Sequence, residues 1–111
     1  MTTSDLIDKI NLKVLSKFEH REVKGVFVSD MMSDVMANAR SGNLWLTIQT
    51  HKSIVSAANL VDVSAVVITS GKNVPQETID LASRYNIGIL LSGLSTFELV
   101  GRLYDLGLGG K

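Results

Sequence analysis

Short apolar runs alternate with amphipathic segments over most of the chain. The apolar runs, which are rich in β-branched residues and typical of buried strands, are 44–48, 65–69 and 87–91. The segments that follow them, in which apolar positions recur every three or four residues, are 53–60, 76–85 and 95–106. The pattern therefore predicts three successive strand–helix units with short connections.

The first part of the chain shows the same patterns less regularly. We expect a first helix with Ser4 as its N-cap that ends near Asn11. Two short strands at 12–15 and 26–28 and a helix at 35–40 follow. Because the turn between these two strands is too short for a crossover helix, they can add an antiparallel section to the sheet.

Strands that read as nearly continuous apolar runs, each followed by an amphipathic helix, are typical of a parallel sheet covered by helices. At 111 residues the chain has the length of one domain. The fold class that we predict is therefore α/β, a single domain over residues 1–111 with a mostly parallel or mixed sheet flanked by helices. The first helix and short strand occupy residues 1–22.

Composition and charge exclude several classes of protein. Lys plus Arg equals Asp plus Glu at 11 each, and aromatic residues make up 5% of the chain, so we expect no nucleic-acid partner. The chain has no cysteine, which excludes disulfides, thiol catalysis and cysteine-held metal centres. No GxGxxG or GxxxxGK[ST] sequence follows a predicted strand. We therefore expect no cofactor and no metal.

The hydropathy pattern indicates where the protein works. The N-terminus is polar, and no apolar run approaches the roughly 18 residues of a membrane-spanning helix. We therefore expect a cytoplasmic protein without a signal peptide or membrane partner. The mean hydropathy of +0.23 is high for so small a domain, which suggests that a second copy covers some apolar surface.

Three loops follow predicted strands at the edge where open α/β sheets bind ligands. At this edge the N–H groups of helix amino ends point outward. The loops are 49–53, 70–75 and 92–96, and they carry hydroxyls and cations without a carboxylate. This chemistry suits a phosphate-bearing anion such as a nucleotide. The predicted ligand-binding residues are Thr50, His51, Lys52, Ser53, Ser70, Lys72, Ser95 and Thr96.

Some of these residues have a structural alternative. Ser53 and Ser95 stand where helix N-caps are expected, and Ser95 with Glu98 fits a capping box, in which Glu98 accepts a hydrogen bond from the N–H of the cap residue. His51 is the candidate acid or base, but its sequence neighbourhood offers no carboxylate to orient it. We therefore expect no catalytic residue.

The segment after the second strand carries two further candidates. Met31, Met32 and Met36 form an adaptable apolar patch, which we predict to be a dimer or partner surface. Asp30 and Asp34 are four residues apart and could meet around a hard cation, but a helix amino end favours aspartate without any metal.

Three stretches resemble the short stand-alone proteins of the DRTGG domain family. They are Gly25-Val26-Phe27-Val28-Ser29-Asp30-Met31-Met32-Ser33-Asp34-Val35-Met36, Gly42-Asn43-Leu44-Trp45-Leu46-Thr47-Ile48-Gln49-Thr50-His51-Lys52-Ser53-Ile54-Val55 and Ser95-Thr96-Phe97-Glu98-Leu99. The resemblance is clearest over residues 23–108. Where family members can show Asp-Arg-Thr-Gly-Gly, this chain has Thr69-Ser70-Gly71-Lys72.

The resemblance implies a fold and a role. The domain also occurs in bacterial phosphotransacetylases and CBS-domain pyrophosphatases, and its fold is similar to the N-terminal domain of HPr kinase/phosphorylase. In those proteins it is an accessory, regulatory or oligomerisation domain, which implies no catalytic activity here. Some stand-alone members are similar to proteins encoded beside iron-only hydrogenase and redox-sensing genes, which implies a partner of that kind.

Three functions follow from these observations. The first is a non-catalytic regulatory or ligand-sensing homodimer that binds a nucleotide or another phosphate-bearing anion at the strand-end loops. The second is an interaction module that docks on a larger partner, such as a hydrogenase- or redox-sensing-associated protein. The third is a small phosphotransferase or hydrolase that uses His51 and Lys52. The sequence shows no acid–base pair for such an enzyme.

Overall fold

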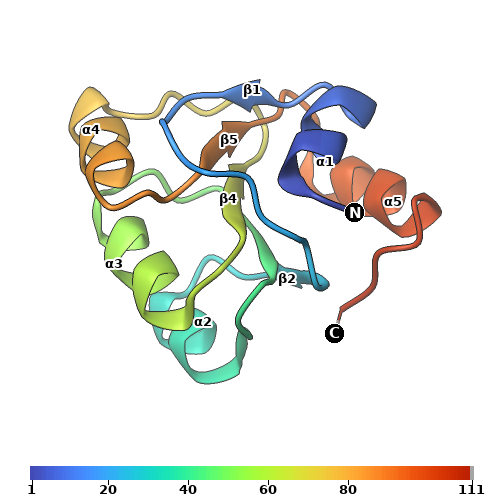
Figure 1. Cartoon of the computed structure of the whole chain (residues 1–111), viewed down its shortest axis with the longest axis horizontal. Coiled ribbons are helices and arrows are strands. Elements are labelled where there is room, and N and C mark those ends of the chain that lie inside the picture. The colour runs from blue at the N-terminus through green and yellow to red at the C-terminus, as the bar shows by residue number, and fades with distance from the viewer. Residues whose placement is uncertain (111) are drawn as a thin grey trace.

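A five-stranded sheet lies between two layers of helices in the computed structural model, which describes residues 1–110 (Figure 1). The strands are β1 Lys13–Val14, β2 Val26–Val28, β3 Leu44–Thr47, β4 Ala65–Ile68 and β5 Ile89–Leu91. The helices are α1 Thr3–Lys9, α2 Met32–Asn38, α3 Ser53–Val61, α4 Gln76–Arg84 and α5 Thr96–Asp105. Every element expected from the sequence is present, with its ends displaced by at most a few residues.

The sheet is mixed, and its strand order is β1-β5-β4-β3-β2. Strands β2, β3, β4 and β5 are parallel to one another, and β1 pairs with β5 in the antiparallel sense. The predicted α/β fold with a mostly parallel sheet is confirmed. The expectation that the first two strands form the antiparallel section together is wrong, because β1 and β2 lie at opposite edges of the sheet.

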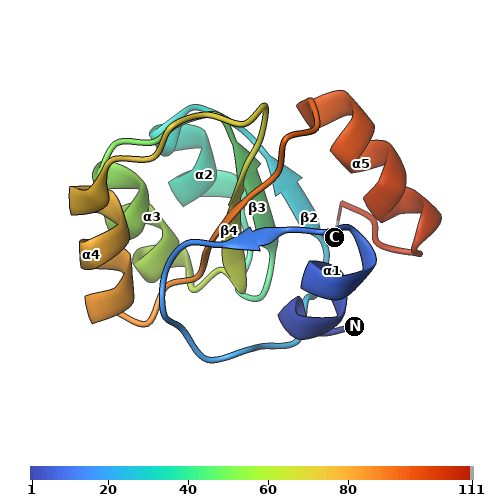
Figure 2. The same cartoon turned by 90° about the horizontal axis from the view of Figure 1, so that it is seen from above.

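The two faces of the sheet bury different helices (Figure 2). Alternate residues of a strand point to opposite faces, so each strand contributes to both layers of the core. The strand residues that pack against α2, α3 and α4 include Trp45, Val66, Ile68 and Ile89. Those that pack against α1 and α5 include Leu44, Leu46, Val67 and Leu90. Because both faces are covered, the strands read as continuous apolar runs.

The segment between β1 and β2, residues 15–25, runs across the amino ends of the parallel strands. The N–H of Glu19 donates to Asn86 before β5, Arg21 donates to the carbonyl of Val63 before β4, and the N–H of Lys24 donates to the carbonyl of Gly42 before β3. These bonds close the amino-end edge of the sheet with the chain's own backbone. This segment leaves the opposite edge, where the parallel strands end, uncovered.

Phe18 fastens this segment to the sheet. A Cβ atom added to Gly88 would lie 2.6 Å from the Phe18 ring, so a side chain at this position would displace the ring. Ser16 adds a buried contact, since its hydroxyl donates to the carbonyl of Ile87 over 2.7 Å and accepts the N–H of Ile89 over 2.6 Å. The polar segment is therefore held by specific contacts at its start.

Helix α1 begins with a capping box. The Thr2 hydroxyl accepts the N–H of Asp5, and the Asp5 carboxylate accepts the N–H of Thr2, which also lowers the pKa of Asp5. The prediction that Ser4 is the N-cap is wrong, because only Thr2 has an acidic residue at the third position after it that can close the box.

The chain after α5 returns to the sheet. The N–H of Val26 in β2 donates to the carbonyl of Gly109 over 2.7 Å, so the glycine-rich tail reaches the first residue of β2 at the outer edge of the sheet (Figure 1). Among residues 1–110, no helix is both long and apolar enough to cross a bilayer.

Candidate functional site

A cleft of about 740 Å³ lies between α3 and α4. It begins at the amino ends of these helices, which follow β3 and β4, and so it opens at the edge where the parallel strands end. Its volume is within the range of small-molecule sites. The residues that line it are His51, Lys52, Ser53, Ser56, Glu77, Asp80, Leu81 and Arg84.

His51 shapes the start of α3. Its Nδ1 atom lies 3.1 Å from the N–H of Ser53 and 3.1 Å from the Ser53 hydroxyl. A backbone N–H can only donate, so Nδ1 accepts, and the neutral ring carries its proton on Nε2. The predicted cap role of Ser53 is therefore wrong: Lys52 is the N-cap residue without a side-chain cap bond, and the His51 ring accepts the helix N–H instead.

Thr50 joins the two helices below the cleft. Its carbonyl accepts a 2.8 Å hydrogen bond from the hydroxyl of Thr78, which is buried in α4. Thr50 is not among the residues that line the cleft. It therefore fixes the distance between the loop 49–53 and α4 rather than offering its side chain to a ligand.

The cleft balances positive and negative groups. Lys52 Nζ lies 3.0 Å from Glu77 Oε1, in a pair whose side chains are 51% and 70% exposed, so the bond is weak and can exchange for a ligand. Asp80 accepts a 2.8 Å hydrogen bond from Gln76, and Arg84 contributes the second cation. The loop 49–53 contributes no carboxylate, as its sequence shows, and both carboxylates of the cleft come from the facing helix α4.

Sequence reasoning missed the α4 side of the cleft. Glu77, Asp80, Leu81 and Arg84 are spaced by three, one and three residues, so they occupy one face of a helix. This spacing is visible in the sequence. What it does not reveal is that this face of α4 lies opposite the start of α3, which is a consequence of the strand order.

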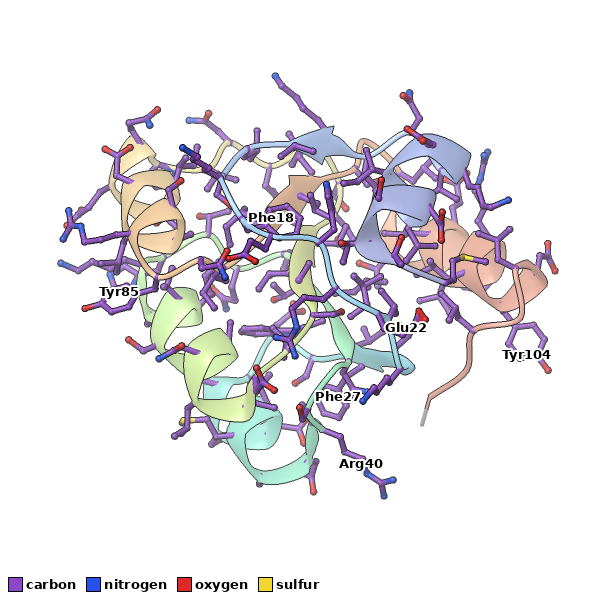
Figure 3. The ribbon with its side chains drawn as sticks, viewed as in Figure 1. Phe18, Glu22, Phe27, Arg40, Tyr85 and Tyr104 are labelled. Atoms are coloured by element: carbon purple, nitrogen blue, oxygen red, sulfur yellow. The ribbon has the colours of Figure 1, made fainter. Side chains whose placement is uncertain are left out.

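A second hollow continues the cleft towards the other ends of the two helices. It has a volume of about 450 Å³, shares Ser56 and Leu81 with the cleft, and is otherwise lined by Val55, Asn59, Leu60 and Tyr85. Leu60 is 71% exposed and Tyr85 is 54% exposed. Figure 3 shows Tyr85 at the outer end of the molecule beside these helices. The groove between α3 and α4 is thus charged at one end and apolar at the other.

The other two candidate loops bind each other. The N–H of Ser70 donates to the carbonyl of Leu94 over 2.8 Å, and the N–H of Gly71 donates to the carbonyl of Ser92 over 2.9 Å. The hydroxyls of Thr69 and Thr96 are 2.7 Å apart. The backbone N–H groups of Ser70 and Gly71 are therefore already used and not free for an anion. The structure does not bring Ser70, Lys72, Ser95 or Thr96 into the cleft.

Ser95 is a helix cap, as its alternative interpretation predicts. Its hydroxyl accepts the N–H of Glu98 at 3.2 Å and lies 3.3 Å from the Glu98 carboxylate, to which it donates. The expected bond from the Ser95 N–H to Glu98 is replaced by this contact between the two side chains. The Ser95 hydroxyl therefore has its hydrogen-bond partners without a ligand.

The methionines separate into two environments. Met31 is 63% exposed and Met36 is 48% exposed, whereas Met32 packs against the buried core on the α2–α3–α4 face. Met32 is therefore not part of the predicted dimer or partner surface, because consecutive residues at a helix start point in different directions. Met31 and Met36 remain available to a partner.

Asp30 and Asp34 do not share a site. Asp30 accepts hydrogen bonds from the Thr47 hydroxyl and the N–H of Ile48, whereas Asp34 accepts one from Asn38. The bond from Asn38, with a smaller contribution from Ser29, lowers the pKa of Asp34. Residues 1–110 contain no group of three or more histidine or acidic side chains placed to hold a metal ion.

The fold is similar to a solved regulatory structure. The similarity is to the CBS and DRTGG domains of the regulatory region of Clostridium perfringens pyrophosphatase, complexed with its activator, diadenosine tetraphosphate. The TM-score is 0.71 and the sequence identity is 17%. The match covers 91% of this chain and 45% of that one, so this chain spans less than half of the matched structure.

Family membership follows from the sequence itself. No curated protein matches the chain significantly. The model of the DRTGG domain matches residues 5–106, which is nearly all of the 111 residues and includes both helices of the cleft. The resemblance seen in the sequence is thus confirmed, and the chain belongs to the DRTGG domain family.

Proposed function

We propose that the protein is a non-catalytic regulatory or ligand-sensing domain, homodimeric and cytoplasmic, that binds a nucleotide or another phosphate-bearing anion between α3 and α4. The observation that carries the proposal is the two-part groove, with paired cations and carboxylates at one end and Tyr85 and Leu60 at the other. The proposed ligand site therefore consists of the loop 49–53 and helix α4, whereas the sequence suggests all three strand-end loops.

A nucleotide supplies groups that match each part of this groove. Its phosphate accepts hydrogen bonds, which suits Lys52, Arg84 and the Nε2–H of His51. Its ribose hydroxyls donate, which suits the carboxylates of Glu77 and Asp80. Its base is flat and largely apolar, which suits stacking beside Tyr85. A bare inorganic anion would leave the carboxylates and the apolar end without partners.

The solved relative supports the ligand class. Its activator is a dinucleotide with a phosphate chain, bound to a regulatory region that contains CBS as well as DRTGG domains. At 17% identity the residues of the site do not transfer. The relative therefore supports nucleotides as the first ligands to try, and the groove of this chain supports where they bind.

The geometry at His51 argues for a non-catalytic role. In a Ser-His-Asp arrangement the Nδ1–H of histidine donates to an orienting carboxylate. Here Nδ1 accepts the N–H of Ser53, so it has no proton to donate in that state. The third hypothesis, a small phosphotransferase that uses His51 and Lys52, lacks this support.

Calorimetric titration with AMP, ATP, diadenosine tetraphosphate and acetyl phosphate tests the proposal. A bound ligand at 100 times its dissociation constant stabilises the fold by about 2.7 kcal/mol, which a thermal shift detects independently. Arg84→Ala should weaken binding about tenfold or more, whereas Lys72→Ala, which removes a cation outside the groove, should leave it unchanged.

Two results would contradict the proposal. If none of these four compounds binds, the nucleotide and acyl-phosphate forms of the function are wrong. If Lys72→Ala weakens binding and Arg84→Ala does not, the ligand sits at the loops 70–75 and 92–96 instead of the groove.

The second candidate function, an interaction module that docks on a larger partner, is favoured by the exposure of Met31 and Met36. A pull-down from lysate with the wild-type chain and with a Met31→Glu/Met36→Glu variant tests it. A partner retained by the wild type and lost by the variant would support docking through these methionines, and retention by both would exclude this surface.

A further inference from the structure

Helix α5 presents an apolar stripe to solvent. Phe97 is 88% exposed, Val100 is 37% exposed and Tyr104 is 74% exposed. Their spacing of three and four residues places them on one face of the helix, opposite Leu99 and Leu103, which are buried against the sheet. Side chains of this size on one exposed helix face mark a surface that another molecule covers.

A glycine lies within the stripe. Gly101 is in the middle of α5, where glycine weakens a helix relative to alanine. A Cβ atom added to it would meet no atom within 4 Å apart from its chain neighbours and the backbone of its own helix, so packing within the described chain does not require a glycine. A small residue between Phe97 and Tyr104 lets the backbone of another element approach closely.

An apolar hollow of about 200 Å³ adjoins the far end of the stripe. It lies between α5, β2 and the tail, and its lining includes Val28, Val100, Tyr104 and Leu108. The stripe therefore carries a projecting ring, Phe97, at one end and a recess at the other, with Gly101 between them.

We propose that this stripe is the surface through which two copies of the chain associate. An antiparallel arrangement about a two-fold axis between Val100 and Gly101 puts Phe97 of one copy beside Tyr104 and the hollow of the other, and the reverse contact forms at the same time. A second copy is complementary to both ends of the stripe at once. This inference rests on the homodimer of the proposed function and names its interface.

Size and charge agree with a second copy. Aromatic side chains bury about 150–250 Å² each, so the exposed parts of Phe97 and Tyr104 supply about 250–400 Å². That is roughly a third to a half of the 800 Å² or so per partner in a specific interface, and the hollow and its borders add to it. The stripe is flanked by Glu98, Arg102 and Asp105, which give no single-sign field for a polyanion or an anionic membrane.

The proposed interface leaves the ligand groove open. Figure 3 shows Tyr85 and Tyr104 at opposite ends of the molecule. Substitutions on α5 should therefore change assembly without changing nucleotide binding, and the two proposals can fail separately.

Sedimentation equilibrium of the full chain tests the interface. The wild type should be a dimer, and Phe97→Glu or Tyr104→Glu should raise its dissociation constant about tenfold or more. Val14→Glu is the control, because Val14 is an exposed apolar residue of β1 that lines neither the groove nor the hollow. Gly101→Ala should weaken the dimer while leaving the circular dichroism spectrum and the melting temperature of the dilute monomer no lower.

Three results would overturn the inference. They are a monomeric wild type, a dimer that survives both glutamate substitutions, and a dimer that is lost only in the Met31→Glu/Met36→Glu variant. A monomeric Phe97→Glu variant that still binds the titrated nucleotide would support both proposals. A wild-type dimer that binds none of the nucleotides would contradict the proposed ligand and leave the proposed interface standing.

Discussion

Arg21 and Asp62 form a two-bond ion pair that joins the segment across the strand amino ends to the turn after α3. Nη1 lies 2.8 Å from Oδ1 and Nη2 lies 3.1 Å from Oδ2. Asp62 adopts a left-handed backbone with φ of 67°, and its carboxylate also accepts the hydroxyl of Ser41. The bond from Arg21 and then that from Ser41 lower the pKa of the Asp62 carboxyl.

The lowered pKa predicts how stability depends on pH. The contribution of Asp62 is fully present above its unfolded pKa of about 3.9 and is lost as pH falls through the lower pKa of the folded state. Because the Asp62 side chain is 60% exposed, we expect no more than about 0.5–1 kcal/mol.

Urea unfolding of the wild type and of Asp62→Asn at neutral pH and at about pH 3 measures this contribution. Asparagine tolerates the left-handed backbone, so the variant isolates the charge. The difference between the two proteins should shrink in acid, whereas the control Asp8→Asn, at an exposed residue of α1, should show little difference at either pH. An equal Asp62→Asn effect at both pH values would contradict the ion-pair account.

The capping box of α1 predicts unequal effects of two similar substitutions. Thr2→Ala removes the side chain that accepts the N–H of Asp5 and should cost about 1 kcal/mol. Ser4→Ala lies inside the first turn, makes no cap bond and should change stability by less than about 0.5 kcal/mol. Chemical denaturation measures the free energy of unfolding of both variants. A larger loss of stability in Ser4→Ala than in Thr2→Ala would indicate that Ser4 is the cap after all.

Two glycines that look alike in the sequence should respond oppositely to alanine. At Gly88 the new Cβ atom would lie 2.6–2.8 Å from three atoms of the Phe18 ring, so overpacking should cost about 1–3 kcal/mol. At Gly93 a new Cβ atom would meet no atom within 4 Å apart from its chain neighbours, so alanine should be tolerated. Thermal unfolding of Gly88→Ala, Gly93→Ala, Phe18→Ala and Gly88→Ala/Phe18→Ala measures this. In the Phe18→Ala background the ring is absent, so Gly88→Ala should add little further destabilisation, and an equal cost in both backgrounds would show that Phe18 is not the obstacle.

His51 should have two separable roles. His51→Ala removes both the acceptor for the Ser53 N–H and the Nε2–H donor in the groove, so stability should fall by about 0.5–1 kcal/mol and ligand affinity should fall too. His51→Asn keeps an acceptor near the helix N–H and should recover most of the stability without recovering the affinity. Parallel unfolding and titration experiments measure both, and unchanged affinity in the two variants would remove His51 from the ligand site.

The order of the elements was predictable, and their pairing was only partly so. Runs such as 65–69 and the helix spacing after them depend on local periodicity, which the sequence displays directly. The partner of β1 depends on long-range contacts, such as the bonds of Ser16 to Ile87 and Ile89, for which no local pattern exists. The sequence therefore predicted a mixed sheet and the wrong neighbour for its antiparallel strand.

The candidate site shows the same division. Topology alone placed the loop 49–53 at the edge where the carboxyl ends of the parallel strands meet, which is where open α/β sheets tend to bind ligands. Topology did not reveal that the N–H groups of Ser70 and Gly71 donate to carbonyls of the neighbouring loop. Nor did it reveal that Glu77 and Arg84 face the start of α3. Such facts depend on which backbone groups find each other after the sheet has formed.

The contact between the tail and β2 has a consequence for solubility. An outer strand with unpaired N–H and C=O groups is a template for aggregation through strand addition, and nature shortens or covers such strands. Here β1 has only two residues and carries Lys13, while β2 has three residues and the N–H of its first, Val26, is bonded to Gly109 of the tail. Removal of the chain after Leu106 should thus free this N–H and make the outer edge of β2 more open to strand addition by other chains, which a rise in light scattering on standing would detect.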